Sequence, residues 1–175
     1  MSNLSQHERT TDGKEEWLTD PAIIKALEVF DLDPCAPVSR PWDMANRHYT
    51  IADDGLIQPW EGRVWLNPPY GLKTRTWIKL LSEHGNGIAL IYARTETKIF
   101  FPYVWDCADS IFFFKGRLLF YNSDGTPCTN KKTGKIEYAG APSCLIAYGE
   151  QNCQAIKEAG FKGKYVPLTV KALEH

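Results

Sequence analysis

The run GIALIY at positions 87–92 constrains the fold most, because it contains no charged residue. A strand that is apolar at nearly every position is expected where both faces of a sheet are covered by other elements. The preceding segment, TRTWIKLLSEHGN, has the apolar spacing of an amphipathic helix and ends in a Gly-Asn stop signal. A buried strand beside such a helix indicates an α/β architecture.

The same alternation runs through the first two thirds of the chain. WLTDPAIIKALEVF predicts a helix with Thr19 or Asp20 as its cap and Pro21 in its first turn. Further strands are expected in FDLDPCA, GRVWLNPPYG, SIFFFKGRLLFY and SCLIAYG, with a kink at 115–117, and TETKIFFPYVWDCAD predicts a broken helix. This order predicts a mostly parallel sheet flanked by helices.

The length of 175 residues suits one domain, which we place at 17–172. The polar segment 1–16 is expected to be a flexible tail, and 173–175 resemble the start of an expression tag. The glycine-rich interruption at 122–142 is long for a compact domain, which favours a functional loop or an inserted hairpin.

Composition excludes several classes of protein. A formal net charge of -1 argues against a histone-like role, although a local basic patch stays possible. No apolar run is long enough to span a membrane. Five widely spaced cysteines without a CxxC pair fit a reduced cytosolic protein better than a disulfide framework or a zinc site, so no metal is expected.

The candidate catalytic motif is Asn67-Pro68-Pro69-Tyr70, which follows a strand-like run. Two prolines restrict the backbone, so these residues form a stiff ledge at a strand end. The Asn67 side-chain oxygen and the Pro68 carbonyl are two neutral acceptors for a planar amino group. The Tyr70 ring offers a flat face for stacking a base.

Other polar residues are expected at the same edge of the sheet. Asp33 ends one predicted strand, Arg94 and Thr95 follow another, and the acidic turn Asp53-Asp54-Gly55 lies between the first two strands. Ligands of open α/β sheets bind beyond the carboxyl ends of the strands. Trp60, Trp65 and Trp77 are interpreted as core residues.

The motif and its companions resemble a known family. WLTDPAIIKAL, FDLDPCA, ADDGL, VWLNPPYG, ALIYARTETKIF and KGRLLF occur in this order. Together they resemble the phage-type DNA adenine-N6 methyltransferases, over about 17–148. The resemblance implies a Rossmann-like methyltransferase sheet, S-adenosylmethionine as cofactor, DNA as partner, and the cytoplasm of a bacterial host as location.

The resemblance also implies residue roles. Asn67, Pro68, Pro69 and Tyr70 would hold a flipped adenine. The cofactor would be bound by Trp17, Thr19, Pro21, Asp33, Pro34, Cys35, and Asp53 or Asp54. One departure from many methyltransferases is that DPCAPVSRPW has no glycine-rich turn.

DNA contacts and rival functions stay open at this point. Arg94 is either a helix cap or a phosphate contact, and Lys131, Lys132 and Lys135 are either a solvated loop or phosphate contacts. The same motif fits methyltransferases of RNA amines or protein glutamine, and a catalytically inactive DNA-binding relative is the third reading. The sequence does not predict an oligomeric state.

Overall fold

The computed structural model describes residues 17–168, so the predictions for 1–16 and 173–175 lie outside the described residues. The strands are β1 (Leu18–Thr19), β2 (Leu32–Asp33), β3 (Arg47–His48), β4 (Val64–Leu66), β5 (Gly87–Tyr92), β6 (Ser110–Phe114), β7 (Phe120–Tyr121), β8 (Ser143–Tyr148) and β9 (Gly163–Pro167). The helices are α1 (Pro21–Ala26), α2 (Thr74–His84), the π-helix η2 (Phe101–Trp105) and α3 (Glu150–Glu158).

Seven strands form one mixed sheet in the order β3-β2-β4-β5-β8-β6-β9. Strands β3, β2, β4 and β5 pair in parallel. β8 pairs antiparallel with both β5 and β6, and β9 pairs antiparallel with β6. The predicted α/β architecture is confirmed, whereas the predicted mostly parallel sheet is not, because three of the six strand pairs are antiparallel.

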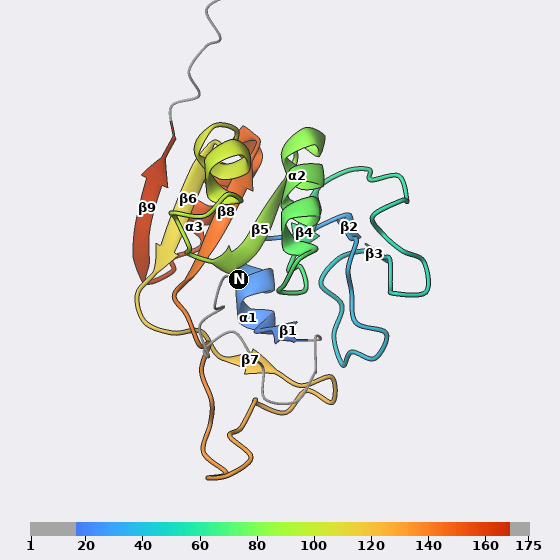
Figure 1. The fold of residues 1–175 in the computed structure, drawn as a ribbon, viewed down its shortest axis with the longest axis vertical. Coiled ribbons are helices and arrows are strands. Elements are labelled where there is room, and N and C mark those ends of the chain that lie inside the picture. The colour runs from blue at the N-terminus through green and yellow to red at the C-terminus, as the bar shows by residue number, and fades with distance from the viewer. Residues whose placement is uncertain (1–16, 169–175) are drawn as a thin grey trace, which may run out of the picture.

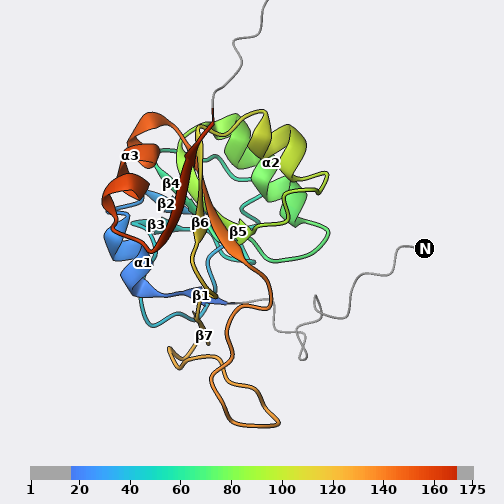
Figure 2. The same ribbon diagram turned by 90° about the vertical axis from the view of Figure 1, so that its left-hand side faces the viewer.

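Helices cover both faces of this sheet, as the apolar run of β5 predicts. Ile88 and Leu90 of β5 pack in the cluster that contains the buried residues of α1 and α3. Ala89 and Ile91 face the opposite cluster, which contains the buried residues of α2 and η2. Figure 2 shows α1 and α3 on one side of the sheet and α2 on the other.

Local signals explain the two helices nearest the motif. The Asp20 carboxylate accepts a hydrogen bond from the Ala22 backbone at 2.8 Å, and Pro21 occupies the first turn of α1. α2 ends at Gly85, whose φ of 73° places it in the left-handed region. The predicted start of α1 and end of α2 are therefore confirmed.

Arg63 connects three elements at the amino end of β4. Its guanidinium donates to the Leu27 and Val29 carbonyls at 2.7 and 3.0 Å and to Asn152 Oδ1 at 2.6 Å. It also lies 4.2 Å from the centre of the Phe30 ring. The side chain thus links the end of α1 to α3 beneath the sheet.

The segment 122–142 folds back on itself as a hairpin. Bridges pair Tyr121 with Pro127, and Thr129 with Ile136. Its entry strand, β7, pairs antiparallel with β1. Both ribbon views show the hairpin projecting beyond the carboxyl ends of the parallel strands (Figures 1 and 2). The kink between β6 and β7 includes Gly116, with φ 91°.

Candidate active site

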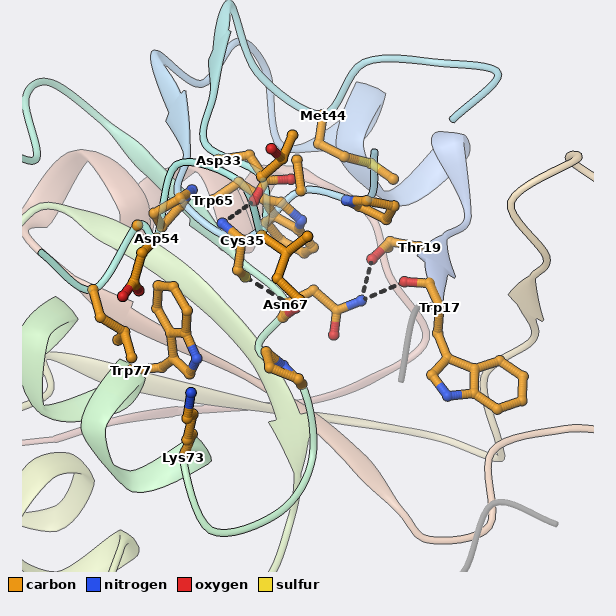
Figure 3. A pocket seen from close by; sticks show the side chains of 18 residues that line it. Trp17, Thr19, Asp33, Cys35, Met44, Asp54, Trp65, Asn67, Lys73 and Trp77 are labelled. Carbon is orange, nitrogen blue, oxygen red and sulfur yellow. Dashed lines mark hydrogen bonds between the residues drawn. The ribbon is translucent and has the colours of Figure 1, made fainter. Parts of the chain in front are cut away.

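A cavity of about 320 Å³ lies at the carboxyl ends of β2 and β4 (Figure 3). This size is within the usual range for small-molecule sites. The predicted residues that line it are Trp17, Thr19, Asp33, Pro34, Cys35, Asp54, Asn67 and Pro69. Of the polar groups expected at this edge, Asp33, the acidic turn and the Asn67 motif therefore meet at the cavity, whereas Arg94 and Thr95 do not line it.

Hydrogen bonds define the orientation of the Asn67 amide. Its Nδ2 donates to the Trp17 carbonyl at 3.1 Å and to Thr19 Oγ1 at 3.3 Å. A carbonyl can only accept, so the nitrogen must face these two groups. Figure 3 shows Oδ1 directed away from Trp17 and Thr19. Oδ1 is consequently left as an acceptor at the cavity.

Asp33 and Cys35 connect the end of β2 to the motif. Asp33 Oδ1 accepts a hydrogen bond from the Cys35 backbone at 3.1 Å, which closes the turn through Pro34. Cys35 Sγ donates to the Asn67 carbonyl at 3.3 Å. Burial raises the pKa of the Cys35 thiol well above its usual value, which keeps it a donor. The cysteine therefore supports the motif as a neutral thiol.

Asp33 is a buried carboxyl group with an altered pKa. Burial raises the pKa of Asp33 to about 7, while the Cys35 hydrogen bonds and the charge of Arg40 act in the opposite direction. Burial is the dominant cause, because only 3% of the residue is exposed. The group therefore exchanges its proton close to neutral pH.

The acidic turn contributes one of its two aspartates to the cavity. Asp53 Oδ2 accepts hydrogen bonds from Thr50, through the backbone at 2.8 Å and the hydroxyl at 2.9 Å, and these lower the pKa of Asp53. Asp54 has φ 51° and lines the cavity. Of the two aspartates, Asp54 therefore lies at the cavity, whereas Asp53 accepts hydrogen bonds within the turn.

The segment after Asp33-Pro34 has no glycine, but Gly55 in the acidic turn approaches the same segment closely. A Cβ atom added at Gly55 would lie 1.9 Å from the Pro34 carbonyl oxygen and 3.3 Å from the Trp77 ring. Only glycine allows this approach of the backbone. The close backbone contact with Pro34 is therefore made by the loop that contains Gly55.

Three donors at the cavity were not predicted as site residues. The buried Nε1 atoms of Trp65 and Trp77 have no hydrogen-bond partner among residues 17–168. Lys73 also lines the cavity, and Figure 3 shows its amino group directed towards Trp77. Trp65 and Trp77 are core residues, as interpreted, but they are cavity residues too. The spacing of Lys73 and Trp77, four apart at the start of α2, is the signal that could have revealed them.

Tyr70 lies beside the cavity lining and stacks on Tyr92. The ring centres are 4.2 Å apart and the planes differ by 13°. The buried Tyr70 hydroxyl has no hydrogen-bond partner in the described part of the chain. Thr74 fixes the end of the motif, because its hydroxyl donates to the Pro69 carbonyl at 2.8 Å and accepts from the Gly71 backbone at 2.9 Å.

The remaining predicted site residues lie outside the cavity lining. Pro21 is in the first turn of α1, and Pro68 is the buried residue of the ledge itself. Arg94 follows the end of β5. The exposed lysines of the hairpin are Lys131, Lys132 and Lys135. Over residues 17–168 no group of His, Cys, Asp or Glu could hold a metal ion, and no helix is long and apolar enough to cross a membrane.

The cavity residues fit a nucleoside-like cofactor. Two unpaired indole N–H groups and an ammonium group offer donors to ring nitrogens or a carboxylate. Asp33 and Asp54 offer acceptors to hydroxyl or amino groups, and the tryptophans supply apolar walls. S-adenosylmethionine carries all of these complementary groups.

The comparisons with known proteins agree with this chemistry. No curated protein and no solved structure matches the chain significantly. A family model described as DNA N-6-adenine-methyltransferase (Dam) matches residues 6–151. That range contains both walls of the cavity and the Asn-Pro-Pro-Tyr ledge. The chain therefore belongs to the DNA N-6-adenine-methyltransferase (Dam) family.

Proposed function

We propose that this protein transfers a methyl group from S-adenosylmethionine to the N6 amino group of adenine in DNA. The observation that carries the proposal is the Asn67 amide, whose nitrogen is occupied by Trp17 and Thr19 while its oxygen stays available at the cavity. Membership of the Dam family supports the reaction class. The sheet would then be a Rossmann-like methyltransferase sheet with an antiparallel second half.

The cofactor would occupy the cavity between β2, β4 and the 50–56 loop. Asp33 and Asp54 would accept hydrogen bonds from its hydroxyl or amino groups, and Trp77 and Lys73 would donate to its acceptors. Cys35 and Pro34 would pack beside it, and Trp17 and Thr19 would border its amino-acid end. When bound, S-adenosylmethionine supplies an electrophilic methyl group.

The target adenine would be held by the ledge. Asn67 Oδ1 and the Pro68 carbonyl would accept the two hydrogens of the amino group, which orients its nitrogen lone pair towards the methyl group. Tyr70 would stack against the base, which must leave the duplex to reach it. Asn67 is neutral, so the proton lost from nitrogen would pass to solvent during or after transfer.

The Arg94 side chain and the hairpin lysines Lys131, Lys132 and Lys135 would contact DNA phosphates. Arg94 follows the carboxyl end of β5, and the lysines belong to the hairpin that projects beyond the parallel strands (Figures 1 and 2), which supports this assignment. We further propose a phage or prophage origin and a cytoplasmic location in a bacterial host, since both follow from the phage-type resemblance and from DNA as the substrate.

The experiment that tests the proposal is incubation of the protein with methyl-labelled S-adenosylmethionine and DNA of mixed sequence. Digestion to nucleosides should place the label in N6-methyladenine, and sequencing around the modified base should give the recognition site. Parallel reactions contain RNA or glutamine-containing protein. Label in either of these instead of DNA would overturn the choice of substrate, and calorimetric binding without any transfer would indicate an inactive relative.

A further inference from the structure

We propose that Arg94 and Arg117 together bind one phosphate of the DNA strand next to the adenine to be methylated. This inference rests on the proposed function and adds a binding site to it. Arg117 lies in the kink between β6 and β7, far from Arg94 in the sequence. The two cations reach the same place from the ends of different strands, β5 and β6.

Tyr92 is the residue at which the two arginines meet. Arg94 follows it directly beyond the end of β5, with the Arg94 backbone N–H donating to the Tyr92 carbonyl at 2.8 Å. The backbone of Gly140 acts to lower the pKa of Tyr92, which places Gly140 close to the Tyr92 hydroxyl. The Arg117 guanidinium donates to the Ala139 carbonyl at 3.5 Å, one residue before Gly140. This chain of contacts brings Arg117 to the hydroxyl side of Tyr92.

The ionisation of Tyr92 is consistent with that arrangement. Burial raises the pKa of Tyr92, while the positive charges of Arg94 and Arg117 both act to lower it. Both guanidinium groups are therefore close enough to interact electrostatically with the Tyr92 phenol. Two positive charges gathered around one phenol favour the binding of an anion.

The stacked rings relate this cluster to the target base. Tyr92 lies 4.2 Å from Tyr70, which is the proposed platform for adenine. The arginines are consequently one ring away from the base site. A base that leaves the duplex rotates about its own backbone, so its flanking phosphates stay near the mouth of the site. Arginine suits this position, because its planar fork binds two phosphate oxygens at once.

The cluster also connects the base site to the hairpin. Ala139 and Gly140 lie at the base of the hairpin, and the Ala139 backbone N–H donates to the Leu118 carbonyl at 2.8 Å. The Ala93 backbone N–H donates to the Pro142 carbonyl, also at 2.8 Å, which joins the other end of the hairpin to β5. The bound DNA backbone would therefore run from Arg94 and Arg117 towards the lysines of the hairpin.

Neutral methylphosphonate linkages provide the test. Each phosphate flanking the methylated adenine of the identified recognition sequence is replaced in turn, and affinity for the duplex is measured by fluorescence anisotropy without cofactor. For the wild-type protein, one replacement should weaken binding about tenfold, as expected for the loss of a charge-assisted contact. In Arg117→Gln and in Arg94→Gln, the same replacement should weaken binding less than twofold, because the contact is already lost.

Matched variants make the outcome decisive. Arg47→Gln removes an exposed arginine that pairs with Glu61 away from this edge, and it should keep the wild-type sensitivity. Arg117→Lys keeps the charge without the fork and should give an intermediate effect, which also serves if Arg117→Gln does not fold. If the arginine variants remain as sensitive as wild type to every replacement, or if no single replacement weakens wild-type binding, the phosphate site is refuted. Failure of the wild-type protein to methylate or bind DNA would instead refute the proposed function.

Discussion

The side-chain nitrogen of Asn67 lies 3.3 Å from the hydroxyl oxygen of Thr19, although 48 positions separate the two residues in the sequence. The contact joins β1, which belongs to a separate two-stranded sheet, to the loop after β4. The amide that defines the proposed chemistry is therefore oriented by a segment outside the main sheet.

Removing that orienting group should slow the reaction without unfolding the protein. Thr19→Val keeps the shape of the side chain and deletes one acceptor, so we expect kcat at saturating cofactor and DNA to fall about tenfold, the effect of one hydrogen bond. Thr19→Ser should restore most of the rate. An unchanged kcat in Thr19→Val would show that the Trp17 carbonyl orients the amide alone.

Asn67→Ala should abolish measurable methylation while the protein stays folded. In comparable enzymes, loss of one positioned hydrogen-bonding group at the reacting centre lowers kcat by a factor of about 100 to 1,000. Thermal unfolding should change little, because Asn67 is only partly buried. Cofactor affinity, measured by calorimetry, should remain within about threefold of wild type. Full activity in this variant would remove Asn67 from the proposed mechanism.

The buried Asp33 carboxyl predicts a specific pH dependence of stability. The pKa of Asp33 is about 7 in the folded protein, against an ordinary value of 3.8, so between these pH values the unfolded chain has released a proton that the folded protein retains. The free energy of unfolding should therefore fall as pH rises through this window.

Asp33→Asn tests this dependence, because asparagine has the same shape and no ionisation. Urea unfolding at pH 5 and pH 8 should show the variant gaining about 2 to 3 kcal/mol relative to wild type between the two pH values, at about 1.4 kcal/mol per pKa unit. A constant difference between the two proteins would contradict the raised pKa. Comparison with wild type cancels the contribution of other titrating groups.

The Arg63 guanidinium is expected to be a major stabilising group. Only 4% of the residue is exposed, and it donates to two carbonyls and an amide oxygen. Arg63→Met should lower the free energy of unfolding by about 3 kcal/mol, because it leaves buried acceptors unpaired. Arg47→Met, which breaks an exposed ion pair with Glu61 and an exposed hydrogen bond to its backbone carbonyl, should cost less than about 1 kcal/mol. Equal effects in the two variants would argue against this role for Arg63.

The hairpin lysines should contribute to DNA affinity through charge alone. Replacing Lys131, Lys132 and Lys135 with glutamine should reduce the slope of log affinity against log salt by about 2.7, at about 0.9 for each phosphate contact. The drop in affinity should be similar for cognate and unrelated duplexes, because phosphate contacts carry no sequence information. Lys79→Gln, on α2, is the control with an unchanged slope. An unaltered slope in the triple variant would remove the hairpin from the interface.

Much of the fold could be predicted because the relevant signals are local. The cap at Asp20, the stop at Gly85 and the apolar run of β5 each indicate their element from neighbouring residues alone. Sheet order depends on distant pairing and is harder to read. A parallel neighbour needs a long crossover, usually a helix, and the segment between β6 and β8 has none. That absence was the available signal for antiparallel pairing.

β9 was not predicted, because its sequence, GKYVP, combines glycine, proline and lysine and lacks an apolar alternation. It becomes a strand through its pairing with β6. The cavity shows a similar limit. Asn67 and Asp33 could be identified from their places at strand ends, whereas the donors Trp77 and Lys73 depend on how α2 is placed against the loop that contains Gly55.

The approach of Gly55 to the Pro34 carbonyl also bears on how this cavity could change. The two peptide segments touch there without any side chain between them. The distance between these two walls of the cavity is therefore determined by the main chain. Side-chain substitutions cannot adjust it. Even an added methyl group at position 55 would force the walls apart. Variation among related proteins is therefore expected around the rim of the cavity, with the gap itself kept constant.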